Sequence, residues 1–106
     1  MTSTCSTHVL DSARGRPAAG IGLRLLDADG ATVADTRADD DGRVRFEGQV
    51  APGRHTLVVD SGAYFAAQDR DTFYPEVVVA FDVAPGEHHH VAVLLAPFAY
   101  TTYRGS

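Results

Sequence analysis

Lysine is missing from this chain of 106 residues, and cysteine occurs only once, at Cys5. The nine basic residues are all arginines that stand scattered along the sequence, and fourteen acidic residues give a formal net charge of -5. Binding to a nucleic-acid backbone relies on clustered cations, so the composition argues against a nucleic acid as partner. A single cysteine cannot form a disulfide within the chain, and a lone thiol on a strand is more often a packing residue than a nucleophile.

Long apolar runs are also missing. No stretch approaches the ~20 apolar residues of a membrane-spanning helix, so we do not expect this chain to be a membrane protein. The first residues, Met1 to Thr4, show neither the basic start nor the apolar segment of a secretory signal, which predicts a cytoplasmic protein. The length suits one domain, residues 1–106, with a small core relative to its surface, and association would help to stabilise it.

Short runs with β-branched residues alternate with clusters of Gly, Pro and Asp every eight to twelve residues or so, which predicts an all-β fold. The expected architecture is a two-sheet β-sandwich of seven to eight strands. The predicted strands cover residues 5–10, 20–26, 32–37, 43–46, 54–59, 77–83, 88–95 and 98–103.

One segment departs from the strand pattern. Ser61 to Asp69 contains small, helix-compatible residues, and Tyr64, Phe65 and Gln68 stand at helical spacing. We therefore predict one short helix over this segment, with Ser61 as its N-cap.

Three adjacent histidines, His88, His89 and His90, begin a predicted strand. Side chains alternate across a strand, so His88 and His90 should face one side and His89 the other. Such a pair can bind zinc, with His8 from another strand as a third ligand, or it can simply be solvated. No cysteine ligands accompany the histidines, and we expect neither a metal nor another cofactor.

Other polar residues have simpler interpretations. Asp39 to Asp41 lack the ligand spacing and the distal glutamate of a calcium loop and predict a solvated turn. Taken alone, Arg43 after this turn could be an ordinary exposed strand residue, and His55 is expected to be structural or exposed. The hydroxyl residues near the N-terminus lack the flanking glycines of a serine-hydrolase nucleophile. They are Ser6, Thr7 and Ser12.

The C-terminal sequence from Tyr100 to Ser106 resembles the signature of the 5-hydroxyisourate hydrolases, the transthyretin-related enzymes of purine degradation. The resemblance covers essentially the whole chain, although Ala92 and Ala96 replace a proline and a serine of the family pattern. It implies a transthyretin-like sandwich with one helix after the fifth strand. Four further segments agree in order, namely Ser6 to Asp11, Asp41 to Arg43, Phe73 to Val77 and His88 to Val91.

The resemblance implies hydrolysis of 5-hydroxyisourate, the labile product of urate oxidation, to 2-oxo-4-hydroxy-4-carboxy-5-ureidoimidazoline. It implies His8, Arg43 and His90 as catalytic residues. Imidazole suits the activation of water near neutral pH, and the planar guanidinium fork suits adjacent O and N acceptors of a ring. Which histidine is the base stays open. The implied substrate-binding residues are His88, Tyr103, Arg104, Gly105 and Ser106.

The same resemblance implies a homotetramer, a dimer of dimers with sites at the interface between dimers. The alternative function is a non-catalytic, transthyretin-like carrier of a small aromatic ligand. The combination of His8, Arg43 and His90 with the tail from Tyr103 to Ser106 separates the hydrolases from the carriers in this family and favours the enzyme. A purely structural sandwich module is a third reading, and it leaves these residues unexplained.

Overall fold

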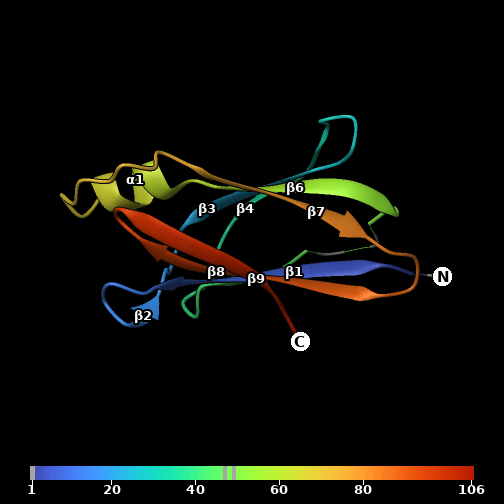
Figure 1. Ribbon diagram of the computed structural model, residues 1–106, viewed down its shortest axis with the longest axis horizontal. Helices are drawn as coiled ribbons and strands as arrows, with labels where there is room; N and C mark the ends of the chain where they lie inside the picture. Colours follow the sequence, from blue (N-terminus) through green and yellow to red (C-terminus); the bar gives the residue numbers. More distant parts are fainter. Residues whose placement is uncertain (1, 47, 49) are drawn as a thin grey trace.

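The computed structural model describes residues 2–46, 48 and 50–106. Two β-sheets pack face to face, and one short helix lies at one end of the sandwich (Figure 1). The predicted two-sheet, all-β fold is confirmed. No helix in the described part of the chain is long and apolar enough to cross a membrane. In chain order the elements are β1 (Thr4–Asp11), β2 (Arg16–Pro17), β3 (Gly22–Leu26), β4 (Thr32–Arg37), β5 (Arg43–Phe46), β6 (Gly53–Val59), α1 (Ser61–Ala66), β7 (Val77–Val83), β8 (His88–Ala96) and β9 (Ala99–Gly105).

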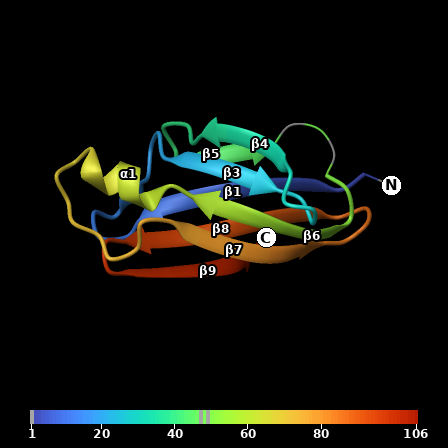
Figure 2. The same ribbon diagram turned by 90° about the horizontal axis from the view of Figure 1, so that it is seen from above.

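The strand order brings the two ends of the chain into one sheet. This sheet has the order β2-β1-β8-β9, with β5 also paired to β1, and the second sheet has the order β4-β3-β6-β7. Strand β1 runs parallel to β8 and antiparallel to β5. Strands β7 and β9 lie at the same side of the sandwich, each at the edge of its own sheet (Figure 2).

Alternation along the strands divides core from surface. In β1 every second side chain, from Cys5 to Asp11, is buried, while the intervening residues are partly exposed. Each fully buried large aliphatic side chain stabilises the fold by about 1.5–3 kcal/mol. The polar residues of β1 and β8 that point away from this core are therefore gathered on the outer face of their sheet. The largest side chains of the core include Ile21, Leu23, Leu25, Leu57, Phe65 and Leu95.

Several predicted element boundaries need correction. The second predicted strand begins at Gly22 instead of Gly20, because residues 18–21 form a turn in which the Ile21 N–H donates to the Ala18 carbonyl at 3.3 Å. Strand β2 was not predicted, since two residues are too short to show a period. The strands over 32–37, 43–46 and 77–83 match their predicted bounds at both ends.

The predicted helix exists but is shorter, and its cap is different. It ends at Ala66 instead of Asp69. The N-cap is Asp60, whose carboxylate accepts the Ala63 N–H at 3.3 Å. Ser61 is buried, and its hydroxyl donates to the Tyr74 carbonyl at 2.7 Å, so it is not available as a cap.

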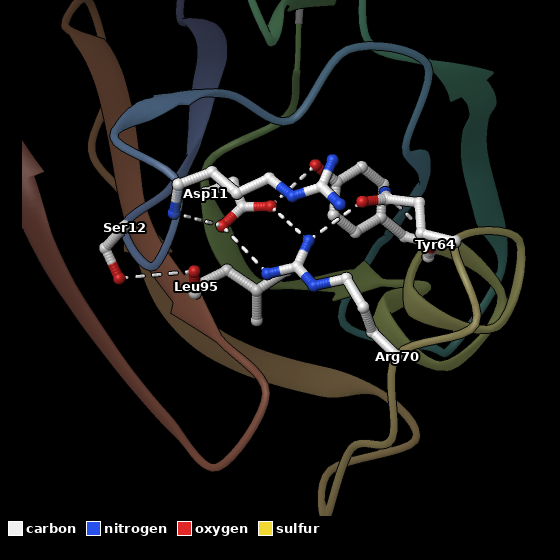
Figure 3. A network of polar contacts seen from close by, with 7 residues as sticks. Asp11, Ser12, Tyr64, Arg70 and Leu95 are labelled. Carbon is white, nitrogen blue, oxygen red and sulfur yellow. Dashed lines mark hydrogen bonds and ion pairs between the residues drawn. The ribbon is translucent and has the colours of Figure 1, made fainter.

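A buried polar network joins the end of β1 to the segment around α1 (Figure 3). The Asp11 carboxylate is fully buried and accepts hydrogen bonds from Arg70 at 2.7 and 3.3 Å and from the Tyr64 hydroxyl at 2.9 Å. Burial alone would raise the pKa of Asp11, but the hydrogen bonds from Arg70, Tyr64 and the Arg14 N–H outweigh it and lower the pKa. Asp11 is therefore held as a buried carboxylate paired with Arg70.

Candidate active site

Polar residues from three neighbouring strands meet on the outer face of the β1-β8 sheet. In the parallel pair, Ser6 lies opposite His90 and His8 opposite Ala92. In the antiparallel pair on the other side of β1, His8 lies opposite Arg43. Residues that pair directly share a face of the sheet, so the register brings His8, Arg43 and His90 together, as the resemblance implied.

A pocket of about 310 Å³ opens on this outer face. Its described lining holds two arginines and two histidines and no aspartate or glutamate, although the chain as a whole has a net charge of -5. A pocket lined by cationic groups concentrates anionic or electron-rich ligands. The lining residues are Ser6, Thr7, Arg43, Val44, Arg45, His88, His90 and Ser106.

The ring of His90 is held on two sides. Its Nδ1 atom lies 2.7 Å from the Ser6 hydroxyl oxygen. On the other side the ring lies so close to Gly105 that a Cβ at this position would overlap His90 Cδ2, so this ring position requires glycine. In the part of the chain that the structure describes, His90 Nε2 has no hydrogen-bond partner, which leaves this nitrogen available to water or a ligand.

The surroundings of His90 favour its neutral form. Burial lowers the pKa of His90 from its ordinary value near 6.5, and the charges of His8, His88 and Arg43 lower it further. A neutral imidazole with a free nitrogen can accept a proton at neutral pH. The geometry and the electrostatics together fit a general base.

The other two histidines of the triplet lie on opposite faces of β8, as strand alternation predicts. His88 faces the pocket side, with Nε2 at 2.9 Å from Ser6 Oγ and Nδ1 at 2.6 Å from Thr4 Oγ1. His89 is buried on the core side, where its Nε2 accepts the Ala84 N–H at 2.9 Å. His55 is also buried, and its Nδ1 lies 3.1 Å from the Gly53 carbonyl, so of the two predicted alternatives, structural or exposed, the structure favours the first.

The turn before β5 sets the position of Arg43. The Asp39 carboxylate accepts the backbone N–H groups of Asp41 and Arg43, each at 2.9 Å, which confirms the predicted turn. Among the described residues, the guanidinium groups of Arg43 and Arg45 have no hydrogen-bond or ion-pair partner. Sequence reasoning missed Arg45, although its distance of two residues from Arg43 places both on one face of β5.

The C-terminal residues divide between the two faces of β9. Gly105 lies opposite His90, and Ser106 lines the pocket, where the chain end points away from the second sheet (Figure 1). Tyr103 lies opposite Ala92, on the outer face, and is exposed. Arg104 lies opposite the inward-facing Val91 and pairs with Glu87 at 3.2 Å, outside the pocket. The substrate-binding roles of His88 and of Tyr103 to Ser106 stay predictions.

Two alternative chemistries find less support. Within the described residues no group of three or more His, Cys, Asp or Glu side chains is arranged to hold a metal ion. His88 and His90, the pair considered for zinc, are joined by the Ser6 hydroxyl. Cys5 is buried in the core, and burial raises the pKa of its thiol to about 11, so the thiolate required of a nucleophile is disfavoured.

Comparisons with known proteins indicate the family of this chain. The chain is 39% identical to the 5-hydroxyisourate hydrolase of Salmonella typhimurium over 108 residues, which cover 95% of this chain and 79% of that protein. Its structure resembles the 5-hydroxyisourate hydrolase of Klebsiella pneumoniae, with a TM-score of 0.91, 35% identity and coverage of 98% of this chain and 94% of the other.

The likeness extends to a ligand carrier. Sea bream transthyretin in complex with thyroxine has a TM-score of 0.85 and 28% identity, with 95% of this chain and 93% of that chain covered. A sequence model that describes both kinds of protein matches nearly the whole length, from residue 5 to residue 105. The chain therefore belongs to the HIUase/Transthyretin family.

Proposed function

We propose that this protein hydrolyses 5-hydroxyisourate to 2-oxo-4-hydroxy-4-carboxy-5-ureidoimidazoline, a step of urate degradation. The observation that carries the proposal is that one pocket combines His90, whose neutral form is favoured, with Arg43; among the described residues, His90 Nε2 and the Arg43 guanidinium have no partner. The similar proteins of Salmonella typhimurium, by sequence, and of Klebsiella pneumoniae, by fold, are both named 5-hydroxyisourate hydrolase.

In the proposed mechanism His90 is the base. Its Nε2 takes a proton from water while the water oxygen attacks the ring carbonyl next to N1. Arg43 donates to the carbonyl oxygen as negative charge develops there. The bond between this carbon and N1 then breaks, and His8, which lies opposite Arg43, supplies a proton to the leaving nitrogen. His90 returns its proton to solvent, and the free His8 takes one up, so both histidines regain their starting forms.

The pocket also offers groups to orient the substrate. Arg45 and His88 line the pocket beside the catalytic groups, and Ser106 lines it as well. Arginine presents several donors in a plane, which matches the carbonyl and nitrogen acceptors of a urate-like ring. Gly105 acts by leaving room for the His90 ring.

A transthyretin-like carrier is the alternative function, since sea bream transthyretin binds thyroxine on a similar fold. A carrier site needs shape and apolar contact but no base. Two histidines and two arginines that line the pocket therefore favour the hydrolase over the carrier.

The test is optical. Urate oxidase generates 5-hydroxyisourate, and its decay is followed with and without this protein; only acceleration over the spontaneous decay counts. Alanine at His8, Arg43 or His90 should lower turnover by about 10²-fold or more. Arg24→Ala is the matched control, because Arg24 is an exposed strand arginine in the other sheet. Equal losses in Arg43→Ala and Arg24→Ala would contradict the assigned site.

The tail provides a second test. Deletion of residues 103–106 removes Ser106 from the pocket and the strand segment beside His90, but it removes no large side chain from the core. We expect turnover to be lost while the thermal transition changes little. Full activity of the deleted protein would exclude a role for the tail.

We propose further that the protein is a homotetramer, a dimer of dimers, located in the cytoplasm. Unpaired edges of β7 and β9 lie at one side of the sandwich, and a second pocket of about 290 Å³ lies between them. Phe73 and Phe98 are exposed on the surface. Closed symmetric association covers such edges and apolar groups. Light scattering should give four times the chain mass of 11.3 kDa, and a fully active monomer would contradict the proposal.

A further inference from the structure

The Ser6 hydroxyl has an unusual set of partners. Two other hydroxyls of the same sheet donate to backbone carbonyls: Thr7 to Val91 at 2.7 Å and Thr102 to Ala92 at 2.9 Å. The contacts of Ser6 Oγ are instead two imidazole nitrogens, His90 Nδ1 at 2.7 Å and His88 Nε2 at 2.9 Å. The Ser6 hydroxyl therefore forms hydrogen bonds with the two imidazole rings and not with the backbone of the sheet.

We propose that Ser6 is a positioning residue that joins His88 and His90 into one hydrogen-bonded unit and so sets which nitrogen of His90 carries the proton. The catalytic part of this inference rests on the proposed function. The structural part, the control of the His90 ring by Ser6, does not.

The register of β1 and β8 builds this unit. The parallel pairing places Thr4 opposite His88 and Ser6 opposite His90. All four side chains share the outer face, because each strand contributes alternate residues. Thr4 Oγ1 lies 2.6 Å from His88 Nδ1, so the chain of contacts runs from Thr4 through His88 and Ser6 to His90.

Counting protons shows how the unit couples the two rings. A hydroxyl has one hydrogen to donate, so Ser6 can donate to only one of the two imidazoles and must accept from the other. If His90 Nδ1–H donates to Ser6, then Ser6 donates to His88 Nε2, and His90 Nε2 carries a lone pair. In the opposite arrangement Ser6 donates to His90 Nδ1, and the proton of His90 is on Nε2.

The first arrangement is the base form that hydrolysis requires. Uptake of a proton at Nε2 makes His90 an imidazolium with a proton on each nitrogen, and the second arrangement follows once this imidazolium has given up its Nδ1 proton. A shift between them moves one proton from His90 Nδ1 to Ser6 and the Ser6 proton to His88 Nε2. The proton taken from water stays on His90 Nε2, while the added positive charge now resides on His88, which is exposed and can release a proton to solvent. No proton is gained or lost in the shift.

The charged groups around the unit influence the direction of this proton shift. Arg43 and Arg45 face it from β5, and His8 faces it from β1. Cations near His90 disfavour an imidazolium there, as the lowered pKa of His90 indicates. Passing a proton outward to the exposed His88 therefore relieves the charge that develops at His90.

Three variants test the proposal. Ser6→Ala removes the hydroxyl, Ser6→Thr retains one, and Ser12→Ala is the matched control, since the Ser12 hydroxyl donates to the Leu95 carbonyl at the other end of β1. The ring nitrogens of His90 are observed by ¹⁵N NMR. We expect the Nδ1 signal to move in Ser6→Ala and to stay near its wild-type position in Ser6→Thr and Ser12→Ala.

Activity is measured on the same proteins. Displacement of a catalytic ring by about 1 Å can cost on the order of 10²-fold, so Ser6→Ala should lower kcat by about 10- to 100-fold and Ser6→Thr should restore most of it. A Ser6→Ala protein with wild-type ring signals overturns the proposal, whatever its activity. If the wild-type protein fails to accelerate 5-hydroxyisourate decay, the proposed function fails, while the ring signals still decide the role of Ser6.

Discussion

Replacement of Arg70 by methionine should destabilise the fold strongly while leaving the pocket residues in place. Methionine retains much of the aliphatic stem but removes the cation that pairs with the fully buried Asp11 carboxylate at 2.7 Å. Removing one partner of a buried ion pair costs about 3–5 kcal/mol, because the remaining charge is left uncompensated. The Arg70 side chain is 17% exposed and Tyr64 still donates to Asp11, so we expect the lower end, about 3 kcal/mol.

The assay is urea unfolding at pH 7, with all variants at one protein concentration because association would contribute to stability. For a domain near this size, a loss of about 3 kcal/mol corresponds to a decrease of Tm of roughly 10–20 °C. Glu87→Gln is the matched control, because it breaks the exposed ion pair with Arg104, and such pairs contribute about 0–1 kcal/mol.

The pH dependence gives a second check on the same pair. In the wild type the pKa of Asp11 is lowered on folding, so its stabilisation is present above the unfolded value near 3.9 and is lost as the pH falls through the folded value. The variant lacks the cation, so acid protonates its carboxylate more readily. The difference in unfolding free energy between wild type and Arg70→Met should therefore shrink in acid. A difference below about 1 kcal/mol at pH 7, or one that does not change with pH, would refute this reasoning.

Three further predictions concern activity. Gly105→Ala should lower kcat by about 10²-fold with little change in the unfolding midpoint, because a Cβ would displace the His90 ring; an active variant would show that the ring tolerates the shift. Because the pKa of His90 is lowered and the base must be neutral, turnover should persist below pH 6.5 and fall only as the pH drops through the lowered value; a loss that begins above pH 6.5 would count against His90 as base. Dialysis against a chelator should leave turnover intact, whereas a loss that zinc alone restores would favour a metal-bound hydroxide.

The sequence by itself indicated most of the strands and half of the residues that line the pocket, namely Arg43, His88, His90 and Ser106. Segments such as Thr32–Arg37 and Val77–Val83 are bounded by turn residues, so their ends could be read locally. Alternation also placed His88 and His90 on one face and His89 on the other, because the side-chain period of a strand is a local property. The resemblance in the C-terminal tail indicated the family before any fold was known.

Tertiary structure decided which residues those elements bring together. Ser6 stands between His88 and His90 only because β1 and β8 pair in parallel, and neither strand alone specifies its partner or its register. The pairing of Asp11 with Arg70, 59 positions away, likewise depends on how α1 and its following loop close over the end of the sandwich. Local periodicity determines to which face of its strand a side chain points. The side chain that it meets there depends on the packing of the whole chain.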